Sequence, residues 1–157
     1  MSLKRTPLKR RSKNPKAKAK AEAWKEFSIF IRRRDPLCIT CQASTTEAGH
    51  FIHNVSMLKL HFDPRNVHGQ CARCNRWKHG NLAIYTLFMI DQYGRSVVNE
   101  LNEIAKNRND LNIDKPSIQW YRDIRDQYKE LNGSWRIVCF VAVIEGRHGG
   151  FIKFICV

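Results

Sequence analysis

Apolar residues recur at helical spacing near the start of the chain. Trp24, Phe27 and Ile31 place three apolar side chains on one helical face. The pattern begins near Ala21, and the helix should end before Asp35-Pro36, because a residue that precedes proline disfavours the helical backbone. We therefore predict a helix over residues 21–34.

Three further helices are predicted in the second half of the chain. The first covers residues 81–93 and ends at Gly94, the second covers residues 95–106, and the third begins near Pro116 and reaches Leu131. The apolar positions that carry this pattern are Leu82, Tyr85, Met89, Tyr93, Val98, Leu101, Ala105, Trp120, Ile124, Tyr128 and Leu131. We expect these stripes to form the core, and they also suit the contact face of a homodimer.

The middle of the chain favours short strands. Residues 48–52 and 66–70 are the two predicted strands, and a helix over residues 71–78 follows with Gly80 as its C-cap. Strand, loop, strand and helix in this order form the ββα-metal arrangement. With its flanking helices, the protein is predicted to be of the α+β class.

Two Cys-x-x-Cys pairs flank these strands. Cys38 and Cys41 precede the first strand, and Cys71 and Cys74 follow the second. Four thiolates at two identical spacings suit a tetrahedral structural zinc site that fastens the ββα unit. The first twenty residues contain no apolar segment typical of a secretory signal, so we expect an intracellular protein whose paired thiols bind metal rather than oxidise.

A longer block of motif residues accompanies the cysteines. It consists of Cys38-x-x-Cys41, Ala48-Gly49-His50-Phe51, Phe62-Asp63-Pro64-Arg65-Asn66-Val67-His68-Gly69-Gln70-Cys71-x-x-Cys74-Asn75 and Gly80-Asn81. With these motifs, roughly two thirds of the chain, from Trp24 to about Leu131, resembles the phage NinG/Rap family of recombination endonucleases, of the HNH or His-Me finger type.

The resemblance implies an activity and a setting. It implies a structure-specific endonuclease that cuts branched DNA, such as D-loops and Holliday junctions, with Mg²⁺ or Mn²⁺. The protein would be encoded by a phage or prophage and would act in the cytoplasm of the bacterial host. We expect DNA as its partner, and neither a membrane nor a small-molecule substrate.

The same resemblance implies roles for individual residues. His50 would be the general base, with a pKa near neutrality. Asn66 would tie down the loop and orient His50 through its amide. Asn75 would bind the catalytic cation through its amide oxygen, and His79, four residues later on the same helical face, would be a second ligand.

The metal shell departs from the common HNH pattern. Many HNH sites place a metal-binding Asp directly before the base, where this chain has Gly49. Magnesium favours carboxylate ligands. Glu47, His53 and Asp63 are nearby substitutes, and the sequence does not choose among them. His68 is expected to brace the fold or contact phosphate.

Charge indicates a polyanionic partner. The formal net charge is +14, and residues 1–34 hold 13 of the 28 Lys and Arg residues but only 2 of the 14 acidic residues. Residues 1–20 are predicted to be a basic disordered tail, either a DNA-tracking arm or a solvated segment. The predicted DNA-contacting residues are Lys4, Arg5, Lys9, Arg10, Arg11, Lys13, Arg32, Arg33, Arg34, Arg73, Arg76 and Lys78.

The chain is predicted to divide into three parts. Residues 1–20 form the tail, residues 21–132 form the nuclease-like domain, and residues 133–157 form an apolar extension. The extension has the pattern of a β-hairpin around residues 145–150 and receives no function. The predicted function is a metal-dependent endonuclease acting on branched DNA. The alternatives are a non-catalytic zinc-dependent module that binds nucleic acid and a non-specific HNH nuclease.

Overall fold

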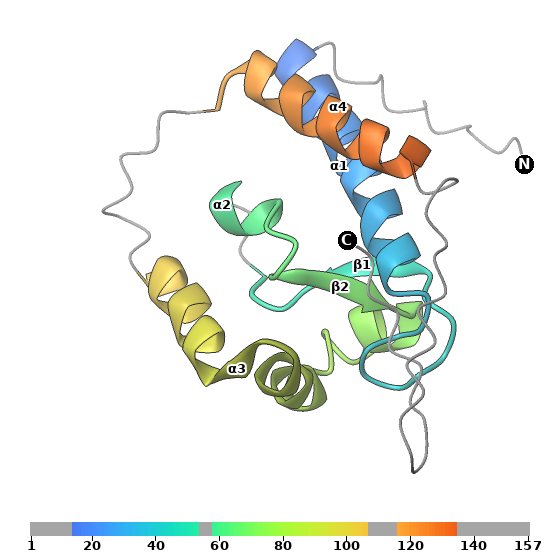
Figure 1. The fold of residues 1–157 in the computed structure, drawn as a ribbon, viewed down its shortest axis with the longest axis vertical. Coiled ribbons are helices and arrows are strands. Elements are labelled where there is room, and N and C mark those ends of the chain that lie inside the picture. The colour runs from blue at the N-terminus through green and yellow to red at the C-terminus, as the bar shows by residue number, and fades with distance from the viewer. Residues whose placement is uncertain (1–13, 54–57, 107–115, 135–157) are drawn as a thin grey trace, which may run out of the picture.

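The computed structural model describes residues 14–53, 58–106 and 116–134. In these ranges a small antiparallel sheet lies between two helical layers (Figure 1). Helices α1 (Pro15–Arg34) and α4 (Ile118–Ser134) form one layer, and α3 (Leu82–Lys106) forms the other. This arrangement confirms the predicted combination of helices with a small sheet. None of the helices in these ranges combines the length and the apolar character needed to cross a membrane.

Helix α1 begins six residues earlier than predicted. The Asn14 side chain caps it by accepting hydrogen bonds from the backbone N–H groups of Lys16 and Ala17, at 3.0 and 3.4 Å. Pro15 occupies the first helical turn, where its missing N–H costs no helical hydrogen bond. Ala19 is buried within the apolar core. The prediction of a disordered tail up to residue 20 is therefore wrong for residues 15–20, and residues 1–13 lie outside the described ranges.

Helices α1 and α4 pack side by side and share the first apolar core (Figure 1). Phe27 and Tyr128 meet edge to face, with 4.8 Å between ring centroids. The core also includes the apolar face of the sheet through Val67, which is fully buried. Helix α4 ends at Ser134, two residues beyond the predicted domain boundary, and the predicted hairpin lies outside the described residues.

Strands β1 (Glu47–His50) and β2 (Val67–Gln70) pair antiparallel, with Glu47 opposite Gln70 and His50 opposite Val67. Both strands were predicted, although β1 ends two residues before its predicted limit. The short helix α2 (Leu58–His61) lies between them in the chain. All four residues of β2 are buried, because one face of the sheet meets α1 and the other meets α3.

Helix α3 contains the break that Gly94 predicted. Gly94 has φ 82° and ψ 161°, a backbone conformation that L-residues rarely adopt, so the helix is interrupted between its two apolar segments. The second core lies on its buried face, formed by Phe51, Leu60, Tyr85, Met89, Val98 and Leu101.

The turn after β2 differs from the predicted α-helix. It is a single π-helical segment, η1 (Arg73–Trp77), in which the N–H of Lys78 bonds to the carbonyl of Arg73 at 3.0 Å. Gly80 ends the turn with φ 85°, and its N–H contacts the carbonyls of Cys74 and Asn75. The C-cap of η1 is Lys78, so the prediction of Gly80 as the C-cap is wrong by two residues, although the Gly80 N–H does close the turn.

Candidate metal centre and active site

The four predicted cysteines form one cluster. Within the described residues, the sulfur atoms of Cys38, Cys41, Cys71 and Cys74 all lie within 4.8 Å of one another, and none is in a disulfide. Four thiolates around a tetrahedral zinc, each about 2.3 Å from the ion, require sulfur separations of this size. The donor set therefore fits a metal ion such as zinc.

Backbone hydrogen bonds hold the first cysteine pair in place. The N–H of Cys41 and of Gln42 both contact the carbonyl of Cys38, and the N–H of Ile39 donates to Gly69 of β2 at 3.0 Å. Burial raises the pKa of Cys38, but hydrogen bonds from Thr40 and from the backbone outweigh this effect and lower the pKa to about 6. The thiolate is the form that binds metal.

His50 ends β1 and lies in a cluster of rings. Its imidazole stacks on Trp24 of α1 and on His61 of α2, with centroid distances of 5.1 and 5.0 Å. Its Nε2 lies 3.2 Å from the carbonyl oxygen of His61. A carbonyl only accepts, so this contact assigns the proton to Nε2 and leaves Nδ1 as the acceptor.

The predicted near-neutral pKa of His50 is wrong. Burial is the largest effect, and together with the nearby charges of His53 and Lys20 it lowers the pKa to about 4, although the hydrogen bond to the His61 carbonyl opposes this shift. The imidazole is therefore uncharged across the physiological range.

Asn66 is fully buried and fastens the loop after β1. Its Oδ1 accepts from the N–H of Ile52 at 2.9 Å, and its Nδ2 donates to the carbonyls of Ile52 and Leu60 at 3.2 and 2.9 Å. As predicted, the Asn66 amide ties down the loop, and its partners are these backbone groups rather than the His50 imidazole. Its link to His50 is therefore through the backbone that follows His50.

Asn75 lies on the other face of the sheet. Its Nδ2 donates to Glu47 Oε2 at 2.7 Å, and the other carboxylate oxygen of Glu47 pairs with Arg76. A Cβ atom on Gly49 would lie 2.9 Å from Asn75 Oδ1 and 2.2 Å from Gln70 Oε1. An aspartate therefore does not fit at position 49 in this arrangement, and the glycine admits two amide oxygens beside the strand.

Gln70 was not predicted as a site residue. It is fully buried, and its Nε2 donates to the Gly80 carbonyl at 2.8 Å, which directs Oε1 towards Gly49. Within the described residues, this Oε1 has no hydrogen-bond partner. A buried oxygen without a partner is costly. The only signal for Gln70 in the sequence was its polar side chain in a strand that lies between two buried layers.

The other candidate ligands separate in the structure. His79 follows the end of η1, is exposed and has φ 48°, so the prediction that it shares a helical face with Asn75 is wrong. Asp63 is paired with Arg65 at 2.9 Å. His53 lies beside His50, with 6.1 Å between ring centroids. Of the three proposed substitutes for the missing aspartate, only Glu47 contacts Asn75 among the described residues.

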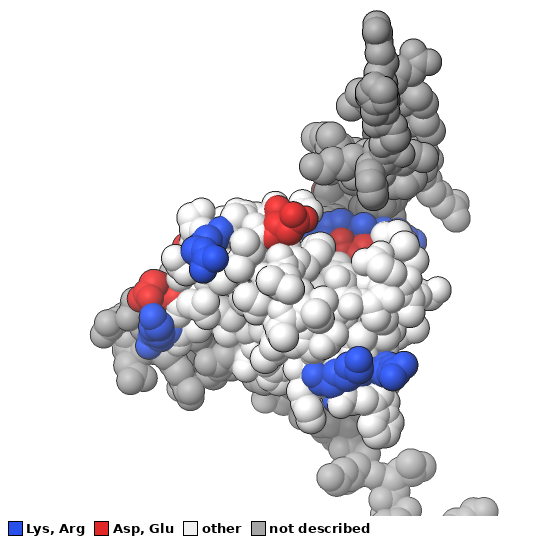
Figure 2. All heavy atoms as spheres, turned by 90° about the horizontal axis from the view of Figure 1, so that it is seen from below, with Lys and Arg blue, Asp and Glu red and all other residues white. Residues whose placement is uncertain are grey.

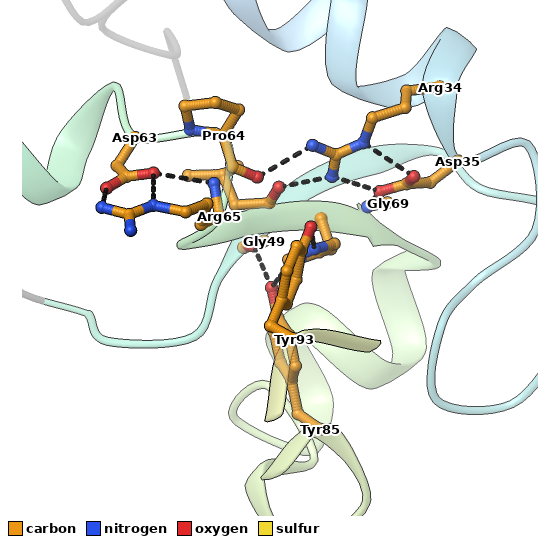
Figure 3. A network of polar contacts seen from close by, with 11 residues as sticks. Arg34, Asp35, Gly49, Asp63, Pro64, Arg65, Gly69, Tyr85 and Tyr93 are labelled. Carbon is orange, nitrogen blue, oxygen red and sulfur yellow. Dashed lines mark hydrogen bonds and ion pairs between the residues drawn. The ribbon is translucent and has the colours of Figure 1, made fainter. Parts of the chain in front are cut away.

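His68 braces the fold, as predicted. Its Nδ1 and Nε2 lie 2.9 Å from the hydroxyls of Tyr85 and Tyr93, and the Tyr85 hydroxyl donates to the Gly49 carbonyl at 3.0 Å (Figure 3). Because Tyr85 donates to Gly49, it accepts from Nδ1, and Nε2 then accepts from Tyr93. Burial lowers the pKa of His68 to about 3, so the imidazole in this series of hydrogen bonds is uncharged.

The predicted DNA-contacting cations fall into four groups. Arg34 bonds to both carboxylate oxygens of Asp35 and to the carbonyls of Pro64 and Val67, so it holds the fold (Figure 3). Arg32 contacts Ser28, and Arg33 contacts the Asn132 carbonyl. The exposed cations on and after η1 are Arg73, Arg76 and Lys78. The remaining six, Lys4, Arg5, Lys9, Arg10, Arg11 and Lys13, lie outside the described residues.

Comparison with known proteins identifies the family. The family model described as bacteriophage Lambda NinG protein matches residues 2–133. Protein ninG of Salmonella phage P22 is 33% identical over 119 residues, which are 69% of this chain and 59% of that protein. Protein ninG of Escherichia phage lambda is 35% identical over 99 residues, which are 60% of this chain and 48% of that protein.

The chain spans about half the length of the curated relatives it matches. No solved structure matches significantly. Because the family model covers most of the chain, this protein belongs to the family described as bacteriophage Lambda NinG protein.

Proposed function

We propose that this protein is a metal-dependent endonuclease of the HNH type that cuts branched DNA during phage recombination. The observation that carries the proposal is the state of His50. Its imidazole is uncharged, its Nε2 proton is directed at the His61 carbonyl, and its Nδ1 is an acceptor. An uncharged imidazole with a free acceptor nitrogen can take a proton from water, and its low pKa makes it a weaker base than an imidazole that titrates near neutrality.

The oxygen atoms around Gly49 support a second part of the site. Glu47, Gln70 and Asn75 offer one carboxylate and two amide oxygens, a donor set that suits Mg²⁺ or Mn²⁺. The unpartnered Oε1 of Gln70 gives this site an oxygen that needs a ligand. A divalent cation held there would polarise the phosphate and neutralise charge on the leaving oxygen.

The proposed site has two halves, which are the His50 imidazole and the oxygen cluster formed by Glu47, Gln70 and Asn75. They lie on opposite faces of the sheet. Successive residues of a strand point to opposite faces, so Gly49 faces η1 while His50 faces α1. Within the described residues, β1 pairs only with β2, so its other edge is free of a strand partner. A phosphate at this free edge would be reached by His50 from one side and by the oxygen cluster from the other.

Basic residues near both halves suit a DNA substrate. Lys20 lies close enough to His50 and His61 to lower the pKa of both imidazoles. Arg73, Arg76 and Lys78 are exposed beside the oxygen cluster. Cations of this kind contact phosphates and position the duplex without reading its sequence.

One observation favours a different function, a non-catalytic zinc-dependent module that binds nucleic acid. Glu47 already contacts both Asn75 and Arg76, and these contacts compete with a cation for its oxygens. Such a module would need the cysteine-bound metal and the basic surface alone.

Incubation of the zinc-loaded protein with matched linear and four-way-junction DNA separates these functions. The enzyme should cut the junction when Mg²⁺ or Mn²⁺ is added and should leave it intact in their absence. Equal cutting of both substrates would indicate a non-specific HNH nuclease. Binding without any cleavage, with either cation, would indicate the non-catalytic module.

A further inference from the structure

Trp77 is the most exposed of the large apolar side chains in the described residues. Its side chain is 79% exposed, at the end of η1. An indole is one of the largest apolar groups that a fold can bury, and this fold leaves it in solvent. Tryptophan and arginine are enriched among the residues that carry most of the energy at binding interfaces.

Three cations surround Trp77 in the chain. Arg73, Arg76 and Lys78 are all exposed, and together with Trp77 they belong to one turn. Charged side chains are sparse on the side of the molecule that Figure 2 presents. An aromatic ring between cations is the combination that binds single-stranded nucleic acid, because the cations engage phosphates and the ring stacks on a base.

The cysteine cluster fixes the position of this turn. Cys74 is fully buried, and the N–H of Asn75 donates to the carbonyl of Cys71 at 3.0 Å. At the other end, the N–H of Gly80 donates to the carbonyl of Cys74 at 2.9 Å. A ring on a backbone held at both ends loses little conformational entropy when it stacks on a ligand.

We propose that Trp77 stacks on an unpaired DNA base beside the proposed cleavage site. The inference rests on the proposed function, because it identifies how that site would select its substrate. Bases within a duplex are already stacked on their neighbours, whereas branch points and single strands expose base faces. Trp77 would therefore favour branched and single-stranded DNA over an intact duplex.

The test measures binding by the full-length, zinc-loaded protein in the absence of Mg²⁺. The probes are a labelled oligo-dT strand, a four-way junction and a blunt duplex. Trp77→Ala should weaken binding to the first two by roughly 5- to 150-fold, which is the range for loss of one stacked base, and should leave duplex affinity and salt dependence unchanged. Trp77→Phe should restore most of the loss, because the smaller ring still stacks.

The control is Leu87→Ala, which removes another exposed apolar side chain, 63% exposed on α3, in a stretch of the helix (residues 82–94) that contains no Lys or Arg. Leu87→Ala should bind all three probes as the parent protein does. Trp77→Ala and Leu87→Ala could instead lose equal affinity for the DNA probes and also self-associate less in sedimentation. This result would show that Trp77 contacts a second copy of the chain and would overturn the proposal.

Parent-like binding of every probe by Trp77→Ala would also overturn it. The proposed function is judged separately, by Mg²⁺-dependent cleavage in the parent protein. A parent that cuts the junction while Trp77→Ala binds normally would retain the function and lose the stacking role. A parent protein that never cuts the junction, but binds oligo-dT through Trp77, would retain the stacking role and lose the proposed function.

Discussion

The indole of Trp24 lies nearly parallel to the imidazole of His50, with 5.1 Å between ring centroids and 10° between ring planes. His61 stacks on both rings. This packing covers the faces of the His50 ring, and burial is the main reason that its pKa falls to about 4. A residue of helix α1 therefore contributes to the burial that keeps the proposed base uncharged.

The first prediction concerns the pH dependence of cleavage. A general base must be deprotonated, so activity should be lost only as the pH falls through about 4, and should stay level between pH 5.5 and 7. Trp24→Ala should return His50 to solvent and move the acid limb towards the ordinary histidine pKa of about 6.5. NMR titration of the His50 ring measures the same shift without activity. A parent profile that rises through pH 6.5 would contradict this account of His50.

The second prediction concerns the cysteine cluster. Structural zinc sites contribute about 10–16 kcal/mol of apparent binding free energy, which is comparable to or larger than the stability of a whole domain. Cys71→Ser should therefore lose bound zinc and unfold, as measured by metal analysis and a thermal melt. Cys139→Ser, which changes a cysteine outside the described residues, is the control and should keep its zinc. Normal zinc content and melting in Cys71→Ser would remove Cys71 from the metal site.

The third prediction concerns the oxygen cluster. Asn75→Ala should abolish Mg²⁺-dependent cleavage and weaken Mn²⁺ binding, measured by calorimetry or EPR, while zinc stays bound. Gln70→Leu should also weaken Mn²⁺ binding, because it removes the amide oxygen that has no partner within the described residues. Asn102→Ala, which alters an exposed asparagine of α3, serves as the control. Unchanged Mn²⁺ affinity in both site variants would place the catalytic cation elsewhere.

The fourth prediction separates folding from DNA contact at two neighbouring arginines. Arg34→Met should lower the free energy of unfolding by about 3–5 kcal/mol, because it leaves the largely buried Asp35 carboxylate without its cation. Arg33→Met should change the free energy of unfolding by less than about 1 kcal/mol, since Arg33 is exposed. Urea unfolding measures both values. Equal stability of the two variants would show that the contacts of Arg34 do not hold the fold.

Several elements could be predicted because local patterns determine them. Apolar spacing placed α3 and α4, Gly94 marked the break within α3, and two equal cysteine spacings identified the sulfur cluster. The helices and the break at Gly94 depend on residues that are close in the chain. The sulfur cluster depends on a metal chemistry in which paired thiolates have few other roles.

Other features depend on contacts between distant residues. The start of α1 was misplaced, although Asn14 and Pro15 mark it locally, because composition does not reveal that Ala19 packs in the core shared with α4. Arg34 looked like one of three equivalent arginines, yet only its guanidinium reaches Asp35 and the carbonyls of Pro64 and Val67. The site itself was only partly predictable, since the burial that lowers the pKa of His50 involves a tryptophan 26 positions away and Gln70 carries no motif signal.

The central claim is that His50 is the general base of a nuclease, and single-turnover cleavage of a four-way junction by His50→Ala tests it most directly. The variant should lose about 10²- to 10⁴-fold in rate while keeping its zinc, its melting temperature and its affinity for the junction. His53→Ala, which removes a neighbouring exposed imidazole, should cut at the parent rate. Cleavage by His50→Ala at the parent rate would contradict the account, and a selective loss in His53→Ala would move the base to that residue.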